Sequence, residues 1–213
     1  MKKIAIIGAG GFGREVKMLI DQINAVENKY EFMGYYDDGI QVEEIINGFP
    51  VLGKIADLDL VDYDLHIAIA VGNPLYKKNI VRQIVNSNIV FPTLIHPSVL
   101  IGNDDFLIGM GSIICAGSII TCNISINNFV IINLACTIGH DTVINNYVSI
   151  MPGVNVSGEV ILCEGVYIGT GAKIINQVEI GKNAVIGSGA VVSKSIPENC
   201  TAVGIPAKPI KFH

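Results

Sequence analysis

A glycine-rich turn near the start of the chain has the residue types and spacing of a phosphate-binding site. The pattern Gly8-x-Gly10-x-x-Gly13 matches the dinucleotide fingerprint, and Asp37 lies at the end of the next predicted strand. Backbone N–H groups at the start of a helix bind anions, so this turn suits a dinucleotide and the diphosphate of a nucleotide-sugar equally well. The alternative is a tight strand-to-helix turn that binds nothing.

The segments around this turn predict a small parallel α/β domain. Apolar runs indicate strands at residues 2–7, 31–36, 66–71 and 89–94, and helical periodicity indicates helices at 14–23 and 74–85. Strands that alternate with helices are typical of a Rossmann-like arrangement. We assign residues 1–92 to this domain, which is too short for the six strands of a complete dinucleotide fold.

Composition excludes several classes of protein. The net charge of -5 argues against nucleic acid as a partner. The chain has no run of 18 apolar residues, so we expect no membrane span. The cysteines are odd in number and lack a CxxC spacing, which predicts reduced thiols in a cytoplasmic protein and no metal site. They are Cys115, Cys122, Cys136, Cys163 and Cys200.

The rest of the chain, residues 93–213, is dominated by a six-residue repeat. Every sixth residue from Ile108 to Val192 is Ile, Val or Leu, and the residue two positions earlier is mostly small or β-branched. This period fits neither a helix nor simple alternation. It fits short flat strands joined by tight turns, three strands to a coil of eighteen residues, with the aliphatic side chain inside.

The repeat therefore predicts a parallel β-helix. We expect the Gly or Asn that often follows the aliphatic residue, such as Gly139, to adopt a positive φ in the turn. Cys136 occupies an inward small-residue position, which excludes it as a nucleophile. The alternative is another six-residue solenoid without catalysis.

Six motifs, in order along the chain, resemble a known family. They are IIGAGGFGREV from Ile6, YYDD from Tyr35, IAIAVGNP from Ile67, LIHPSVLIG from Leu94, INLACTIGHD from Ile132 and VGIPAKPI from Val203. The chain resembles the bacterial hexapeptide-repeat sugar acyltransferases of the sialic acid O-acetyltransferase and UDP-amino-sugar N-acetyltransferase group. The resemblance implies a left-handed β-helix, acetyl-CoA as co-substrate, and a homotrimer with active sites between subunits. It also implies an N-terminal domain that holds the nucleotide end of the substrate.

Matching these motifs residue by residue implies a catalytic set. His140 becomes the general base, since neutral imidazole accepts a proton near neutral pH. Asp141, often Glu in the family, would orient the ring, and the backbone N–H of Gly158 would stabilise the oxyanion. Asn133, one hexad earlier, would touch the acceptor. The alternative for His140, Asp141 and Asn133 is that they are solvated turn residues.

The resemblance also implies two binding regions. Pantetheine would run along the β-helix past Gly158, and Lys208 would meet a CoA phosphate. Further CoA contacts are expected at Ser149, Gly169, Thr170, Gly187 and Ser188, although family members often have His where this chain has Ser149. Gly10, Gly11, Phe12 and Gly13 would flank the diphosphate. Asp37, Asp38, Gly72 and Asn73 would line the base and ribose.

The leading functional prediction is acetylation of the amine of a nucleotide-linked amino-deoxy sugar in polysaccharide biosynthesis. The nearest alternative is O-acetylation of sialic acid or another sugar hydroxyl. An alternative from another class is a nicotinamide-binding regulatory module on a non-catalytic solenoid. The sequence leaves open the sugar, its nucleotide and the acetylated position.

Overall fold

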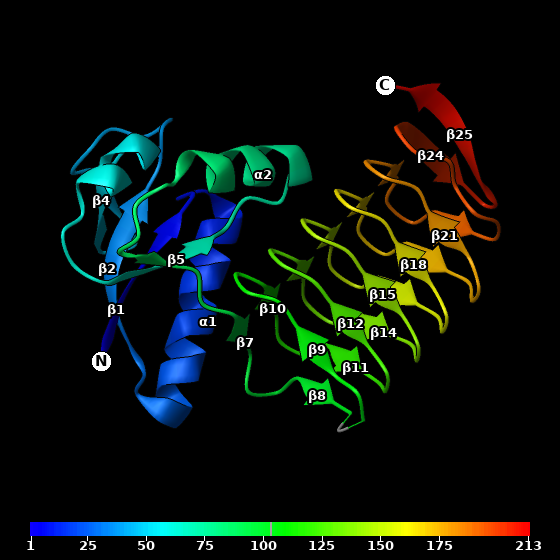
Figure 1. Cartoon of the computed structure of the whole chain (residues 1–213), viewed down its shortest axis with the longest axis horizontal. Helices are drawn as coiled ribbons and strands as arrows, with labels where there is room; N and C mark the ends of the chain where they lie inside the picture. Colours follow the sequence, from blue (N-terminus) through cyan, green and yellow to red (C-terminus); the bar gives the residue numbers. More distant parts are fainter. Residues whose placement is uncertain (103) are drawn as a thin grey trace. The chain divides into compact units, whose positions relative to one another are not determined.

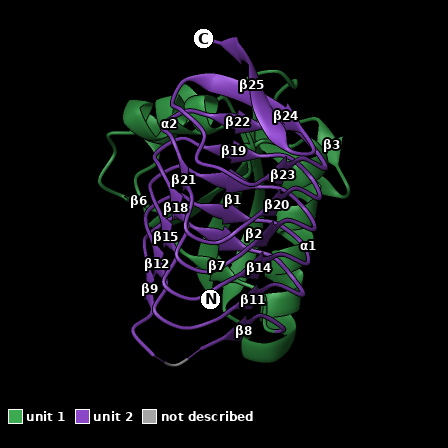
Figure 2. Ribbon diagram, turned by 90° about the vertical axis from the view of Figure 1, so that its right-hand side faces the viewer, with its two compact units in different colours: residues 1–97 green, residues 98–213 purple. Residues whose placement is uncertain are grey.

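A computed structural model describes residues 1–102 and 104–213. These residues form two compact units, residues 1–97 and 98–213 (Figure 2). The boundary predicted from the sequence lies between residues 92 and 93. Among the described residues, no helix is both long and apolar enough to cross a bilayer.

The first unit is an α/β domain around a mostly parallel sheet in the order β3-β4-β2-β1-β5-β6. Its strands are β1 (Lys2–Ile7), β2 (Tyr30–Tyr36), β3 (Ile45–Ile46), β4 (Phe49–Gly53), β5 (Leu65–Ile69) and β6 (Ile89–Val90). The helices are α1 (Gly11–Glu27), α2 (Pro74–Gln83) and the 3-10 helix η1 (Ile55–Leu60). β1 pairs in parallel with both β2 and β5, so the turns that follow these three strands meet at one edge of the sheet. This confirms the predicted Rossmann-like domain. The domain was expected to be too short for six strands, and the sheet reaches that number because β3 and β6 have only two residues each.

Some of its elements differ from the sequence prediction. The helix predicted at 14–23 spans residues 11–27, because it begins within the glycine-rich turn itself. The strand predicted at 89–94 is split into β6 and β7 (Leu94–Ile95). β3, β4 and η1 were not predicted. β4 contains Pro50, a residue that argues against a central strand, and here it pairs with the two-residue edge strand β3.

The second unit is a parallel β-helix whose strands are stacked along its axis (Figure 1). From Leu107 to Val191, each strand pairs with the strand 18 residues further on, as Ile132 pairs with Ile150. This confirms three strands to a coil. We number the three faces in the order in which the chain visits them from residue 113 onward. The left-handed sense stays an expectation from the resemblance.

The strands of each face are short. Face 1 contains β10 (Ile113–Ile114), β13 (Ile131–Ile132), β16 (Ser149–Ile150), β19 (Tyr167–Ile168), β22 (Val185–Ile186), β24 (Cys200–Gly204) and β25 (Ala207–Phe212). Face 2 contains β8 (Leu100–Ile101), β11 (Ile119–Ile120), β14 (Thr137–Ile138), β17 (Asn155–Val156), β20 (Lys173–Ile174) and β23 (Val191–Val192). Face 3 contains β9 (Leu107–Ile108), β12 (Ser125–Ile126), β15 (Val143–Ile144), β18 (Ile161–Leu162) and β21 (Glu179–Ile180).

The repeated aliphatic residues fill the interior, as predicted. From Ile114 to Val192 none of them is more than 2% exposed. The smaller residues two positions earlier are buried beside them, among them Ser118 and Cys136. Burial raises the pKa of the Cys136 thiol to about 11. This thiol is therefore protonated at neutral pH, which supports its exclusion as a nucleophile.

The prediction for the turns was wrong in one respect. Positive φ angles occur at the third residue after the inward aliphatic, not at the first: Ile138 is followed by Asp141 with a φ of 57°. Gly139 is required for another reason. A Cβ at this position would lie 2.6 Å from the backbone nitrogen of Gly158 in the next coil. The coils stack too closely for a side chain there.

Candidate active site

His140 and Asp141 lie at the turn between β14 and β15, which we call corner 2–3 because it joins faces 2 and 3. Nδ1 of His140 is 2.7 Å from Oδ2 of Asp141. Their side chains are 55% and 48% exposed, so the pair lies on the open surface of the single chain. The contact predicted for the short Asp141 side chain is therefore formed within one turn.

Gly158 lies at the same corner, one coil further on. A Cβ on Gly158 would lie 2.5 Å from Cε1 and Nε2 of the His140 ring, so only glycine fits beneath the imidazole. The neighbouring Glu159 N–H donates a hydrogen bond of 2.7 Å to the His140 carbonyl. His140, the predicted base, and the backbone predicted to stabilise an oxyanion are thus next to each other.

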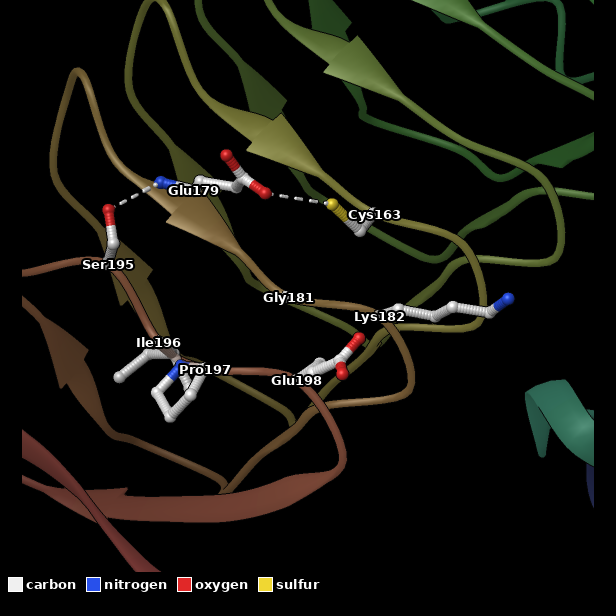
Figure 3. A pocket seen from close by; sticks show the side chains of 8 residues that line it. All are labelled: Cys163, Glu179, Gly181, Lys182, Ser195, Ile196, Pro197 and Glu198. Atoms are coloured by element: carbon white, nitrogen blue, oxygen red, sulfur yellow. Dashed lines mark hydrogen bonds between the residues drawn. The ribbon is translucent and has the colours of Figure 1, made fainter.

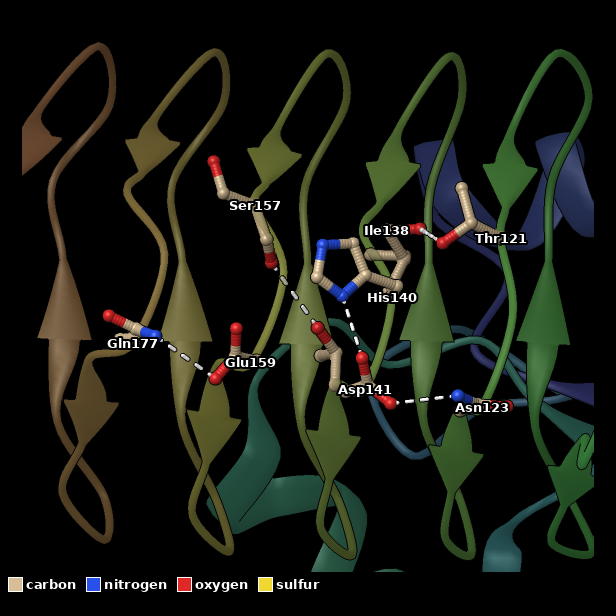
Figure 4. A network of polar contacts seen from close by, with 9 residues as sticks. Thr121, Asn123, Ile138, His140, Asp141, Ser157, Glu159 and Gln177 are labelled. Carbon is tan, nitrogen blue, oxygen red and sulfur yellow. Dashed lines mark hydrogen bonds and ion pairs between the residues drawn. The ribbon is translucent and has the colours of Figure 1, made fainter.

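Asn123 is a member of this site that the sequence analysis missed. Its Nδ2 donates a 2.8 Å hydrogen bond to Oδ1 of Asp141 (Figure 4). This bond, followed by the one to His140, lowers the pKa of the Asp141 carboxyl. Asn123 precedes Asp141 by 18 residues, which is one coil. The period of the repeat therefore contained the signal that places them together.

Asn133 and four of the predicted CoA contacts lie at a different corner, between faces 1 and 2, which we call corner 1–2. Asn133 follows β13 and is only 5% exposed, and its Oδ1 accepts a 2.7 Å hydrogen bond from Leu134 N. The CoA candidates follow β19 and β22 at this corner. They are Gly169, Thr170, Gly187 and Ser188. Within one chain, none of these residues is brought to the corner of His140.

Corner 1–2 carries an open strip along the β-helix. Gly153, Gly171 and Gly189 occupy its left-handed positions in three successive coils, with φ angles of 69°, 72° and 67°. A Cβ at any of the three would have no neighbouring atom within 4 Å. The corner therefore has room for an extended ligand beside the predicted CoA contacts.

The two remaining CoA candidates have different surroundings. Ser149 lies on face 1 and is fully buried, which leaves pantetheine no surface to contact. This burial argues against Ser149 as one of the CoA contacts. Lys208 lies in β25, where it is exposed and pairs with Val203 of β24. Its ammonium group is free to meet a phosphate.

The glycine-rich turn of the first unit contains two kinds of glycine. A Cβ on Gly10 or Gly11 would meet no atom within 4 Å, which leaves the start of α1 open to an anion. Phe12, on the first turn of α1, is partly exposed. A Cβ on Gly13 would overlap the carbonyl oxygen of Gly8. Gly13 is therefore required for packing, whereas Gly10 and Gly11 leave space for a ligand.

The polar residues predicted to line the base and ribose also shape these turns. Asp37 accepts hydrogen bonds from Ala9 N at 2.9 Å and Gly39 N at 2.8 Å, so its carboxylate ties the glycine-rich turn to the end of β2. Oδ1 of Asp38 accepts from Ile55 N at 2.9 Å.

The turn after β5 is held by its own cap. Gly72 precedes Asn73, whose Oδ1 caps α2 by accepting from Leu75 N and Tyr76 N. Asp37, Asp38 and Asn73 therefore have structural partners at the edge where a nucleotide would bind. Each retains further hydrogen-bonding capacity.

A groove of about 490 Å³ lies beside β21 and the turn that follows it (Figure 3). Cys163 at its edge donates a 3.4 Å hydrogen bond to Oε1 of Glu179. Burial, and then Glu179, raise the pKa of this thiol to about 11, so it is no thiolate at neutral pH. In the described part of the chain, no three His, Cys, Asp or Glu side chains converge as metal ligands.

Comparisons with known proteins agree with both halves of this description. Residues 3–84 match the family described as the PglD N-terminal domain, and residues 159–194 match the bacterial transferase hexapeptide (six repeats). A GDP-perosamine N-acetyltransferase from Escherichia coli O157:H7 is 31% identical over 141 residues. This match covers 66% of the chain and 63% of that enzyme, which is less than two thirds of the relative's length.

Two solved structures match nearly the whole chain. The acetyltransferase domain of PglB from Neisseria gonorrhoeae, in complex with acetyl coenzyme A, is 33% identical with a TM-score of 0.89, over 98% of this chain and 99% of that one. PerB from Caulobacter crescentus, in complex with CoA and GDP-perosamine, is 25% identical with a TM-score of 0.88, over 99% and 98%. The chain therefore belongs to the hexapeptide-repeat sugar acetyltransferase family.

Proposed function

We propose that this protein transfers the acetyl group of acetyl-CoA to the amine of a nucleotide-linked amino-deoxy sugar in the cytoplasm. The observation that carries the proposal is the His140–Asp141 pair stacked on Gly158. Two features support it: the open glycine-rich turn of a PglD-type domain, and the similarity to structures that contain acetyl coenzyme A, or CoA with GDP-perosamine.

The reaction needs a base that accepts a proton and a hydrogen-bond donor that stabilises the oxyanion. The neutral sugar amine attacks the thioester carbonyl, and His140 removes the proton that the nitrogen loses. The backbone N–H of Gly158 stabilises the negative charge on the carbonyl oxygen. The C–S bond then breaks as the amide forms, and the protonated His140 returns its proton to the CoA sulfur. Asp141 orients the ring and stabilises its charged form.

The proposal includes a homotrimer with active sites between subunits. His140 at corner 2–3 and the open glycine strip at corner 1–2 are at different corners of one β-helix. Corner 2–3 of one protomer, placed against corner 1–2 of its neighbour, would complete a site that neither holds alone. Asn133 and Lys208 would reach the substrates in the same way. A sedimentation mass near that of a monomer at micromolar concentration would contradict this arrangement.

The nucleotide subsite is tested by replacing Gly10. Because the space beside Gly10 is open, we expect Gly10→Val to fold and to block the approach of the diphosphate. KM for the nucleotide-sugar should rise by about 10²-fold or more, the effect of losing several phosphate hydrogen bonds, while KM for acetyl-CoA stays unchanged. Gly13→Ala is the contrasting variant, because its Cβ would overlap Gly8 and lower the melting temperature. An equal rise in both KM values for Gly10→Val would contradict the assignment of a nucleotide-binding subsite to this turn.

The function itself is tested with a panel of acceptors and acetyl-CoA, following release of the free thiol. We expect transfer to nucleotide-linked amino sugars, and none to the matching nucleotide-linked sugars that carry a hydroxyl instead. Transfer only to sialic acid or another hydroxyl would replace N- by O-acetylation. Tight NADH binding without CoA binding would overturn the proposal.

A further inference from the structure

Four polar side chains form a column at corner 2–3, one from each of four successive coils (Figure 4). Asn123, Asp141, Glu159 and Gln177 have left-handed φ angles of 56°, 57°, 58° and 59°. The order is amide, acid, acid, amide, and each amide donates to the acid next to it. Asn123 Nδ2 is 2.8 Å from Asp141 Oδ1, and Gln177 Nε2 is 3.1 Å from Glu159 Oε2.

The two acids in this column differ in the hydrogen bonds that their carboxylates make. The Asp141 carboxylate is bonded on both sides: Asn123 donates to Oδ1, and His140 Nδ1 lies 2.7 Å from Oδ2. A planar group held at both oxygens has little freedom to rotate, so the imidazole that it contacts is fixed as well. Glu159 is bonded to His140 only through its backbone N–H. Its side chain is bonded to Gln177 instead.

The chemistry of the contact fixes which end of Asn123 faces the acid. An ionised carboxylate only accepts hydrogen bonds, so the amide nitrogen must face Asp141. This bond is the largest cause of the lowered pKa of the Asp141 carboxyl. The amide therefore favours the anionic form of Asp141. The charged side chains in the column beside His140 are Asp141 and Glu159.

We infer that Asn123 is a positioning residue for the acetyl transfer proposed above, and that it acts on His140 through Asp141. The relay runs from the amide of Asn123 to the carboxylate of Asp141 and then to Nδ1 of His140. This leaves the other ring nitrogen, Nε2, to exchange a proton with the substrate. Asn123 contacts no substrate itself.

The first test deletes each amide of the column in turn. Asn123→Gly and Gln177→Gly remove equivalent side chains at positions whose left-handed φ glycine adopts readily. We expect Asn123→Gly to lower kcat by about twofold, within the range of an exposed charge-assisted contact and below the effect of changing Asp141 itself, without changing KM for acetyl-CoA. Gln177→Gly should leave both constants unchanged. Equal kcat values in wild type and Asn123→Gly would overturn the inference.

The second test uses Asn123→Asp, which keeps the shape of the side chain and replaces the donor with a carboxylate. The added negative charge should repel Asp141 and favour the imidazolium form of His140. We expect the acidic limb of the kcat/KM profile to move to higher pH. Gln177→Glu adds the same charge beside Glu159 and is the control, because an equal shift in both variants would mean that the charge acts through space and not through Asp141. An unmoved limb in a folded Asn123→Asp protein would overturn the relay.

A third measurement separates this inference from the proposed function. The NMR signals of the His140 ring can be followed against pH without any substrate. We expect them to change at higher pH in Asn123→Asp than in wild type, and at the wild-type pH in Gln177→Gly. If wild type acetylates no amino sugar but the ring responds in this way, the relay stands and the proposed function fails. If wild type is active and the ring does not respond, the relay alone fails.

Discussion

Corners 1–2 and 2–3 of the β-helix each have one left-handed position per coil, but different residue types occupy these positions at the two corners. At corner 1–2 the left-handed positions include Gly153, Gly171 and Gly189, beside which nothing lies within 4 Å of a Cβ. At corner 2–3 the same positions hold Asn123, Asp141, Glu159 and Gln177. Side chains in this conformation cost about 1 kcal/mol each, less for Asn and Asp. The repeat does not require polar residues there, so corner 2–3 accepts a cost in four coils that corner 1–2 accepts only at Ala135.

A regular scaffold can therefore place different tasks at different corners. Glycines at the left-handed positions of corner 1–2 leave an open strip against which a long ligand can lie. A corner with polar side chains can hold a base and the groups that orient it. Changes at corner 2–3 should therefore alter kcat, and changes at corner 1–2 should alter KM for acetyl-CoA.

The largest effect should come from His140, the proposed base at corner 2–3. We expect His140→Ala to lower kcat by about 10²- to 10⁴-fold, the usual contribution of general-base catalysis. KM for acetyl-CoA should hardly change, because four of the predicted CoA contacts lie at corner 1–2. Steady-state kinetics at saturating acceptor measure both constants. A nearly normal kcat would favour attack by an already neutral amine without a base.

Gly158→Ala should be the next most damaging change. Its Cβ would lie 2.5 Å from the His140 ring, and the exposed ring can move aside without unfolding the β-helix. A displacement of about 1 Å from the productive geometry lowers a rate by about 10²-fold. We expect that loss in kcat with an unchanged melting temperature. Full activity would show that the ring position over Gly158 is unimportant.

The role of the open strip at corner 1–2 is tested by Gly171→Asn. Asn tolerates the left-handed φ of 72° at this position, so the change places a side chain on the strip with little strain. We expect KM for acetyl-CoA to rise by about tenfold, which corresponds to a loss of about 1.4 kcal/mol in binding, while kcat is kept. Gly117→Asn, with the same φ but a coil before His140, is the matched control. Equal behaviour of the two variants would remove the strip from the CoA site.

The smallest effect should come from Asp141→Asn. An exposed ion pair contributes at most about 1 kcal/mol, so kcat should fall by about fivefold or less. Because a neighbouring carboxylate favours the imidazolium, its loss should move the acidic limb of the kcat/KM profile to lower pH. The comparison needs one acceptor throughout, since the amine adds its own titration. A shift to higher pH would contradict the assigned role of Asp141.

The β-helix could be predicted from the sequence, because a six-residue repeat is local and each inward aliphatic residue marks its own strand. The sequence also predicted the first α/β domain and the pairing of His140 with Asp141, which are adjacent in the chain. The family motifs pointed to Gly158, and the contact with the ring agrees with that assignment.

The eighteen-residue coil already implies that residues one coil apart share a corner, but which of their side chains bond to one another depends on the tertiary structure. Residues one coil apart stack, whereas residues one hexad apart lie at successive corners; this separates Asn133 from His140 and brings Asn123 to Asp141. The tertiary structure also decided that Ser149 is buried, and that Gly13 is a packing glycine while Gly10 faces open space. Residue types alone cannot distinguish these cases, because burial and contact depend on what the rest of the chain places next to each residue.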